Sequence, residues 1–392
     1  MPARKTILFI TSSVEPSGGA EELWMGAAVH LSRRGHRVVA GWSEPLRDVM
    51  NYRGWQSMTA AGVEVGAFRI ADLFRTIPEF LHRYSPKVAS IAYGMRRVVL
   101  SAKFRAIRPD FVVFAQWGTF DGMEWVQLPQ FATRAKVPYA LICQKTSEDM
   151  WPIDHYRARH AGHFREARKV FFVSDHNRRL TELMLGEGIP QAEVVRNPFA
   201  ISARQPLPWP ESPDGIFRLA CVARMYPQDK GQDLLLSVLA LDKWRGRPVE
   251  ISFFGKGDRE EGLRATAQFL GLKNVRFPGF ADGIEQIWKT HHALVLPSRG
   301  EGLPLAQVEA MICGRVPIMG PAGGAAEILE DNVTGFLAAG PTVAALDEAM
   351  ERAWQRRNEW KDIGLRASQS IWNFYPQDPC ADFADKLEKL LP

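Results

Sequence analysis

Cysteine is scarce in this chain. The four cysteines, Cys143, Cys221, Cys313 and Cys380, lie far apart and form no Cys-x-x-Cys pair. This spacing argues against a disulfide framework and against a zinc site, so we expect reduced, mostly buried thiols in a cytoplasmic protein. No apolar run approaches the length that spans a bilayer. The opening MPARKTILFITSS has only a short apolar run after its basic residues, which is typical of a first β-strand and not of a signal peptide.

A strong excess of either charge is also missing, with 49 Lys and Arg against 44 Asp and Glu. The small basic excess is uneven, because residues 69–108 carry nine basic residues and two acidic ones. Such a segment suits peripheral contact with an anionic membrane surface or the attraction of an anionic substrate. A solvated helical face explains it as well, and both interpretations stay open. No groove-reading or single-strand-stacking motif accompanies it, so we expect no nucleic-acid partner.

Short apolar runs alternate with helical patterns twice along the chain. The apolar runs of the first half are residues 6–13, 37–42, 110–116, 138–144 and 169–175. Those of the second half are residues 217–224, 249–257, 275–280, 293–299 and 316–321. Apolar runs that end in polar residues are typical of buried parallel strands. Residues 203–215 hold four prolines and read as a linker between two doubly wound α/β domains that face each other across a cleft.

Two strand-to-helix junctions carry residues that suit a phosphate. Gly18 and Gly19 precede a helix, where glycine lets backbone N–H groups approach a ligand, although a tight turn alone explains them too. Arg224 ends a predicted strand, and Lys230 precedes a helix that begins near Gly231. Two cations at the carboxyl edge of a sheet suit a diphosphate, with Arg as a planar fork and Lys as a point charge. Exposed surface cations are the alternative.

The stretch PSRGEGLPLAQVEAMICG, residues 297–314, places Glu301 in a loop and Glu309 in an apolar helical run. We predict a helix start near Pro304, with free N–H groups at 302–305 as an anion site. Eight helical residues rise about 12 Å, of the order of the span from a hexose across a diphosphate to a ribose. The two carboxylates would then hold opposite ends of one nucleotide sugar. An ordinary solvated pair of glutamates meets the same spacing.

Together these features resemble the retaining GT-B-fold glycosyltransferases of family 4, the glycosyl transferases group 1. The resemblance covers essentially the whole chain and is strongest from Phe217 to Leu337, where residues 297–337 are similar to the family's signature with its Glu-x7-Glu motif. It implies an acceptor-binding domain over residues 1–205 and a nucleotide-sugar-binding domain over 206–374. Residues 375–392 would cross back onto the first domain.

The resemblance also implies roles for single residues. Glu309 would bind the ribose hydroxyls, and Glu301 would contact the donor sugar. Arg224 and Lys230 would hold the diphosphate and stabilise its charge as it leaves, which makes Glu301, Arg224 and Lys230 the expected catalytic residues. The expected donor-binding residues are Gly18, Gly19, Arg224, Lys230, Phe280, Glu301, Gly302, Leu303, Pro304, Leu305 and Glu309. Because the chain shows no Asp-x-Asp motif and the cations can replace a metal, we expect metal-independent catalysis without a cofactor.

The chain departs from the family at the ends of two strands. Gln116 and Gln144 stand where histidine is often found, and glutamine cannot act as a general base at pH 7. Any histidine-assisted step is therefore in doubt. The expected acceptor or sugar contacts are Gln116, Gln144, Lys145, Glu148 and Asn197.

The leading hypothesis is an enzyme that moves a sugar, with retention, from a nucleoside diphosphate sugar to a hydroxyl. The expected acceptor is a saccharide or lipid-linked intermediate of cell-surface polysaccharide or glycoconjugate synthesis. The enzyme would be cytoplasmic, with peripheral contact at the inner face of the membrane as an option. A non-hydrolysing sugar-nucleotide epimerase and a catalytically inactive binding protein are the alternatives. The sequence leaves the base, the sugar and the acceptor open.

Overall fold

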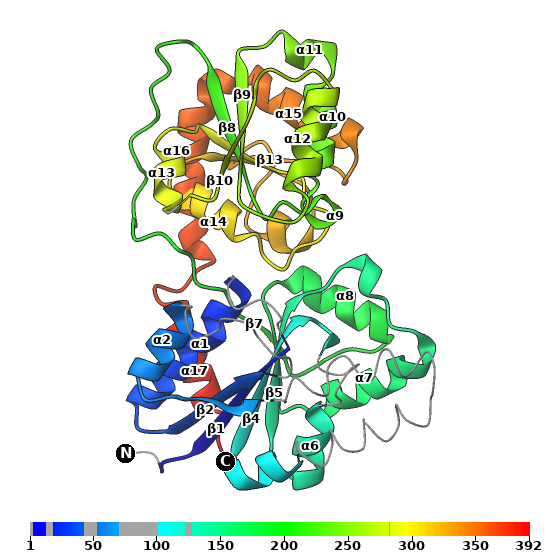
Figure 1. The fold of residues 1–392 in the computed structure, drawn as a ribbon, viewed down its shortest axis with the longest axis vertical. Coiled ribbons are helices and arrows are strands. Elements are labelled where there is room, and N and C mark those ends of the chain that lie inside the picture. The colour runs from blue at the N-terminus through cyan, green and yellow to red at the C-terminus, as the bar shows by residue number, and fades with distance from the viewer. Residues whose placement is uncertain (1–2, 13–18, 43–52, 70–100, 122–127, 282) are drawn as a thin grey trace. The chain divides into compact units, whose positions relative to one another are not determined.

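The computed structural model describes residues 3–12, 19–42, 53–69, 101–121, 128–281 and 283–392 (Figure 1). The chain divides into two compact units, and each is an α/β unit built on its own parallel sheet. The first unit comprises Met1–Val173, Arg178–Pro198 and Gln377–Pro392. The second comprises Ser174–Asn177 and Phe199–Pro376.

The first unit is built on a seven-stranded sheet in the order β3-β2-β1-β4-β5-β6-β7, in which all neighbouring strands run parallel. Its strands are β1 (Thr6–Thr11), β2 (Arg37–Trp42), β3 (Glu64–Arg69), β4 (Phe111–Gly118), β5 (Tyr139–Lys145), β6 (Lys169–Phe172) and β7 (Ala192–Val194). Its helices are α1 (Gly19–Arg33), α2 (Arg53–Ala60), α6 (Leu128–Ala135), α7 (Asp154–Glu166), α8 (Asp175–Leu185, which starts in the second unit) and α17 (Pro379–Glu388), with the 3-10 turn η3 (Glu148–Met150).

Helices cover both faces of this sheet, which is why β5 is buried along its whole length. One apolar cluster joins the sheet to α1, α2 and α17, and a second joins it to α6, α7 and α8 (Figure 1). The C-terminal helix α17 packs against α1, and its Phe383 ring lies 5.0 Å from the ring of Phe171 on β6. The end of the chain therefore completes the core of the first unit.

The second unit is built on a six-stranded parallel sheet in the order β10-β9-β8-β11-β12-β13. Its strands are β8 (Phe217–Val222), β9 (Val249–Phe254), β10 (Val275–Gly279), β11 (Ala293–Leu296), β12 (Val316–Met319) and β13 (Phe336–Leu337). Its helices are α9 (Pro227–Lys230), α10 (Gln232–Leu239), α11 (Asp242–Arg245), α12 (Glu260–Phe269), α13 (Ile284–Trp288), α14 (Leu305–Ile312), α15 (Val343–Gln355) and α16 (Trp360–Ser370). Short 3-10 turns lie at η4 (Gly323–Glu327), η5 (Arg357–Glu359) and η6 (Ile371–Asn373).

The apolar pattern over residues 231–244 suggests one continuous helix, but the structure contains two. The break lies at Leu241, which adopts an extended conformation between α10 and α11. The change of direction buries Trp244, whose indole N–H donates to Asp347 on α15 at 2.7 Å. Burial of a large aromatic ring with its polar atom paired outweighs the propensity of the leucine-rich run to continue as a helix.

Cys143, Cys221 and Cys313 are buried, as predicted, and Cys380 is partly exposed. Within the described ranges, no helix is both long and apolar enough to cross a membrane.

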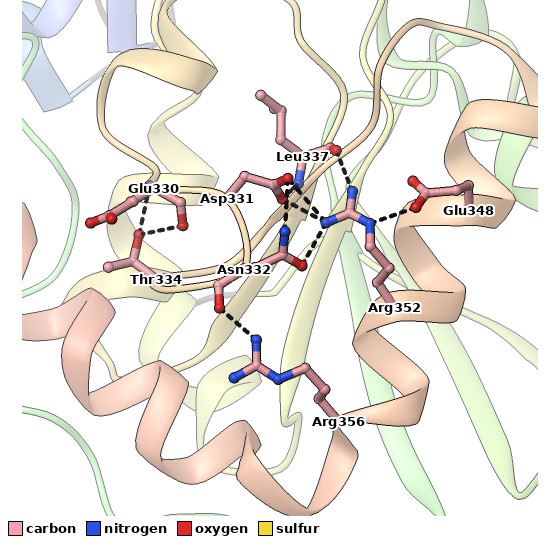
Figure 2. A network of polar contacts seen from close by, with 8 residues as sticks. All are labelled: Glu330, Asp331, Asn332, Thr334, Leu337, Glu348, Arg352 and Arg356. Atoms are coloured by element: carbon pink, nitrogen blue, oxygen red, sulfur yellow. Dashed lines mark hydrogen bonds and ion pairs between the residues drawn. The ribbon is translucent and has the colours of Figure 1, made fainter.

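A polar network fastens the loop before β13 to α15 (Figure 2). Arg352 donates to both carboxylate oxygens of Asp331, at 2.8 and 3.0 Å, and to the carbonyl oxygen of Leu337 at 2.8 Å. Arg356 donates to the carbonyl oxygen of Asn332 at 2.6 Å. The network holds the short strand β13 at the edge of the sheet, opposite to the edge formed by β10.

The proline-rich linker is fastened to the second unit by a buried guanidinium. Arg315 donates to the carbonyl oxygens of Leu207 and Pro208 in the linker, at 3.3 and 2.7 Å. It also donates to those of Trp288 and Cys313, at 2.7 and 2.9 Å. Burial lowers the pKa of Arg315 to about 10, and among the described residues four carbonyl oxygens accept from four of its five N–H groups.

Arg315→Met is expected to lower the free energy of unfolding by about 3 kcal/mol, because it leaves several buried carbonyl oxygens without donors. Urea unfolding measures this loss. Arg276→Met, on an exposed side chain of the same unit, is the control and should change the free energy of unfolding by less than about 0.5 kcal/mol. Equal effects of the two substitutions would contradict the linker role.

Candidate functional site

The turn after β8 lies directly against the segment that follows β11. Gly231, between α9 and α10, has a φ of 65°, and a Cβ added there would lie 2.1 Å from the carbonyl oxygen of Pro297. Only glycine permits both this conformation and this approach. Gln232 closes the turn by donating from Nε2 to the carbonyl oxygen of Arg224 at 2.6 Å. The carboxyl ends of two adjacent strands are thereby brought into contact.

Lys230 and Glu301 form an ion pair at this contact. The Nζ atom of Lys230 lies 2.6 Å from Oε1 of Glu301, and the two side chains are 15% and 10% exposed. Ser298 donates from Oγ to the same carboxylate oxygen at 2.8 Å. The structure thus brings together two of the three predicted catalytic residues, and it adds Ser298, which the sequence analysis did not single out.

The third predicted catalytic residue, Arg224, lies at the start of the same turn. It is exposed, two positions beyond the end of β8. Its carbonyl oxygen accepts from Gln232 and from the backbone N–H of Tyr226, so the backbone that carries the guanidinium is fixed.

Gly323 and Gly324 support the backbone around Glu301. Gly323 has a φ of 56°, and a Cβ there would lie 2.4 Å from the carbonyl oxygen of Glu301. The N–H of Gly324 donates to the carbonyl oxygen of Gly302 at 2.8 Å. These contacts fix the loop immediately before α14.

Helix α14 begins at Leu305, next to the predicted start at Pro304, and no side chain caps its N-terminus. The first N–H groups of a helix have no partner within the helix, so they are available to an anion. Leu303 and Pro304 are buried, whereas Gly302 and Leu305 are partly exposed. The predicted helix start near Pro304 is confirmed, and its role as an anion site stays a prediction.

Glu309 lies inside α14 and is buried. Its Oε1 accepts from the backbone N–H of Ala200 at 2.9 Å. Burial raises the pKa of Glu309 to about 7, and the hydrogen bond from Ala200 opposes this rise. Burial of a carboxylate in this way destabilises the folded state unless further hydrogen-bond donors reach it.

An aromatic side chain marks the far edge of the sheet. Phe280 follows β10 and is 64% exposed, and Nζ of Lys256 lies 5.7 Å from the centre of its ring. An exposed ring at the carboxyl edge of a parallel sheet offers a face on which a planar base can stack. Its role as a base contact stays a prediction.

The predicted acceptor contacts belong to the first unit. Gln144 donates from Nε2 to the carbonyl oxygen of Ala20 at 2.8 Å and accepts from Nδ2 of Asn197 at 2.7 Å. Both side chains are buried, and Oδ1 of Asn197 has no hydrogen-bond partner among the described residues. Gln116 is buried too, with Nε2 3.7 Å from Sγ of Cys143. Gln144 thus links the end of β5 to α1, a packing role that the sequence did not predict.

The remaining predicted residues vary in their surroundings. Lys145 is buried, with Nζ 5.1 Å from the centre of the Trp117 ring, and Glu148 is exposed at the start of η3. Gly19 is the first residue of α1. Gly18 and most of the basic segment 69–108 lie outside the described residues. No cluster of three or more potential metal ligands occurs in the part of the chain that the structure describes.

The fold and the carboxylate–lysine site define a class, the GT-B-like proteins with two parallel α/β sheets. Residues 216–356 match the family model described as glycosyl transferases group 1. The match contains β8 to β13 and every donor-binding residue predicted for the second unit.

Known proteins share parts of this chain. The glycogen synthase of Pseudomonas savastanoi pv. phaseolicola is 31% identical over 176 residues, which is 43% of this chain and 36% of that protein. The chain thus spans about a third of the length of this curated relative. The structure of HepE from Anabaena with UDP and glucose has a TM-score of 0.72 at 19% identity, and 99% of each chain is covered. The apo structure of the lipopolysaccharide outer core galactosyltransferase WaaB has a TM-score of 0.70 at 18% identity, covering 98% of this chain and all of that one. These similarities establish the fold.

Proposed function

We propose that this chain is a retaining glycosyltransferase that takes a sugar from a nucleoside diphosphate sugar, with UDP as the nucleotide, and transfers it to a hydroxyl acceptor. The observation that carries the proposal is the pairing of Lys230 with Glu301 beside the uncapped start of α14, in the helix that contains Glu309. The family match over residues 216–356 and the UDP in the HepE structure support it.

The chemistry follows from the charges at this site. Cleavage of the sugar–phosphate bond places negative charge on the leaving diphosphate. Arg224, Lys230 and the N-terminus of α14 are the groups that would stabilise this charge. In the donor-free protein Lys230 is already neutralised by Glu301, so the bound diphosphate would share the ammonium with that carboxylate. The other oxygen of Glu301 would accept from a hydroxyl of the donor sugar.

The acceptor side of the proposal rests on the first unit. We propose a saccharide or lipid-linked acceptor that contacts Lys145 and Glu148, with Gln144 and Asn197 shaping the surface around them. Peripheral attachment to an anionic membrane through residues 69–108, at the inner face, is part of the same proposal. Gln116 is too deeply buried to reach an acceptor without rearrangement.

Two alternatives make different demands on the site. A non-hydrolysing epimerase would convert the nucleotide sugar into its epimer with no net release of nucleoside diphosphate, whereas a transferase releases most of it only when an acceptor is present. A binding protein without activity would hold the nucleotide and change nothing. An assay for released UDP, with and without mixed saccharide acceptors, identifies the transferase, and chromatography of the nucleotide sugar separates the epimerase from the binding protein.

A thermal-shift screen with UDP, GDP, ADP and dTDP and their common sugars tests the donor site. A ligand at 100 times its Kd stabilises the native state by about 2.7 kcal/mol. That corresponds to a rise in the melting temperature of roughly 5–10 °C for a domain of this size. We expect UDP to give the largest shift, with or without EDTA. A shift that EDTA abolishes would contradict metal-independent binding of the diphosphate. The absence of a shift with every nucleotide would contradict the proposed donor site.

A further inference from the structure

The loop that carries Glu301 is joined to the turn that carries Lys230 by a second ion pair. Arg299 donates from Nη1 and Nη2 to the two carboxylate oxygens of Asp233 in α10, each at 2.7 Å. Its Nη1 also donates to the carbonyl oxygen of Pro227 at 2.7 Å. The pairing with Asp233 raises the pKa of Arg299. A bidentate guanidinium fixes both distance and orientation between the segments that it joins.

The backbone strengthens the same connection. The N–H groups of Arg299 and Gly300 both donate to the carbonyl oxygen of Asp229, at 2.7 and 3.2 Å. These bonds join the loop after β11 to the turn after β8. Lys230 and Glu301 lie at the two ends of this connection.

The two oxygens of Glu301 have different surroundings. Oε1 receives both the ammonium of Lys230 at 2.6 Å and the hydroxyl of Ser298 at 2.8 Å. Oε2 has no hydrogen-bond partner among the described residues. Because Ser298 and Lys230 converge on one oxygen, they restrict rotation of the carboxylate.

We infer that Asp233, acting through Arg299, and Ser298 are positioning residues that set where Glu301 Oε2 meets a hydroxyl of the donor sugar. This inference rests on the proposed transferase function. Ser298 acts through Glu301 and Asp233 acts through Arg299, so their removal should affect turnover and not the affinity for the nucleotide. A misplacement of about 1 Å at a reacting centre lowers the rate by about 100-fold.

The second unit offers a control in another aspartate–arginine pair, in which Nη1 of Arg352 donates to both carboxylate oxygens of Asp331. Asp331 and Arg352 have side chains that are 39% and 25% exposed, against 46% and 32% for Asp233 and Arg299 (Figure 2). Pairs this exposed contribute roughly 0–1 kcal/mol to stability. Asp233→Ala and Asp331→Ala should therefore lower the melting temperature by similar, small amounts.

The experiment follows UDP or GDP released by slow donor hydrolysis, which needs no acceptor. Wild-type protein is assayed first with UDP-glucose, UDP-galactose, UDP-N-acetylglucosamine and GDP-mannose, and a donor that turns over is used for the variants. Asp233→Ala and Ser298→Ala should lower kcat by about 30- to 100-fold, with the Kd for the free nucleoside diphosphate within about threefold of wild type. Asp233→Asn, which keeps one acceptor oxygen for Arg299, should recover part of the loss. Asp331→Ala should change kcat by less than about threefold.

Deoxy analogues of the same donor separate positioning from a general structural defect. In the wild type, removal of the sugar hydroxyl that donates a hydrogen bond to Oε2 should lower kcat/KM by about 10-fold or more. In Asp233→Ala the same removal should have little further effect, because the contact is already lost. If Asp233→Ala loses no more activity than Asp331→Ala, or loses it equally with all deoxy donors, the positioning role is wrong. Absence of turnover in the wild type with every donor and acceptor would instead contradict the proposed function.

Discussion

We expect alanine at both Arg224 and Lys230 to lower kcat by about 1,000-fold or more, because in the proposed reaction both cations would face charge that develops only as the sugar–phosphate bond breaks. Removal of a single donor to a developing anion costs about 100- to 1,000-fold in known cases. The single variant Arg224→Ala leaves the pair between Lys230 and Glu301 intact, and it should lose about 100-fold in kcat. The loss of activity in the Arg224→Ala variant therefore includes no effect of a displaced Glu301.

The measurement is the rate of nucleoside diphosphate release at saturating donor. Lys361→Ala with Arg366→Ala, on α16, removes the same charge elsewhere in the second unit and should leave kcat within about twofold. Removal of Lys230 leaves the buried Glu301 without its cation, so the folded state of the variant is checked by its melting temperature. Near-normal turnover in a folded Arg224→Ala, Lys230→Ala protein would remove both residues from the catalytic site.

Much of the fold was predictable because its central strands are continuous apolar runs. The runs at 110–116 and 138–144 became β4 and β5, since a strand covered on both faces must be apolar along its length. The strands β3, β7 and β13 were not predicted, and of these β7 and β13 have only three and two residues. Strands this short carry no periodic signal of their own, and they form because a neighbouring edge supplies the hydrogen-bond partners.

The sequence indicates candidate residues for the site but not how they pair. Glu301, Glu309 and Lys230 stand out through strand ends, glycines and a helix start. The ion pair of Lys230 with Glu301 joins residues 71 positions apart, and the bond of Asn197 to Gln144 joins residues 53 positions apart. No local spacing encodes such pairs, because they depend on how parallel strands are ordered within a sheet. Gln144 was predicted to contact the acceptor or the sugar, but both ends of its side-chain amide already form hydrogen bonds within the protein.

Glu309→Gln should stabilise the donor-free protein while weakening its grip on the nucleotide. The pKa of Glu309 rises from 4.5 in the unfolded chain to about 7 in the folded one, because the carboxylate is buried. The folded state therefore holds more protons between these values, and stability falls as the pH rises from about 4.5 to about 7. At 1.36 kcal/mol for each unit, the cost is on the order of 3 kcal/mol, present in full above pH 7 and absent below about pH 4.5. Glutamine keeps an acceptor for Ala200 and carries no charge.

Urea unfolding at pH 5 and pH 8 measures this difference in the free energy of unfolding, which should be small at pH 5 and on the order of 3 kcal/mol in favour of the variant at pH 8.

Calorimetry with UDP should favour the wild type, because ribose hydroxyls donate more strongly to a carboxylate than to an amide. The affinity of the wild type relative to the variant should rise between pH 6 and pH 8, as Glu309 loses its proton. The comparison with the variant removes the titration of UDP itself. A variant that is no more stable at pH 8, yet binds UDP as tightly as the wild type, would show that this buried carboxylate serves neither as a strained group nor as a ligand for the ribose. A gain in stability together with a loss of affinity would mean that the Glu309 carboxylate destabilises the fold but contributes to nucleotide binding.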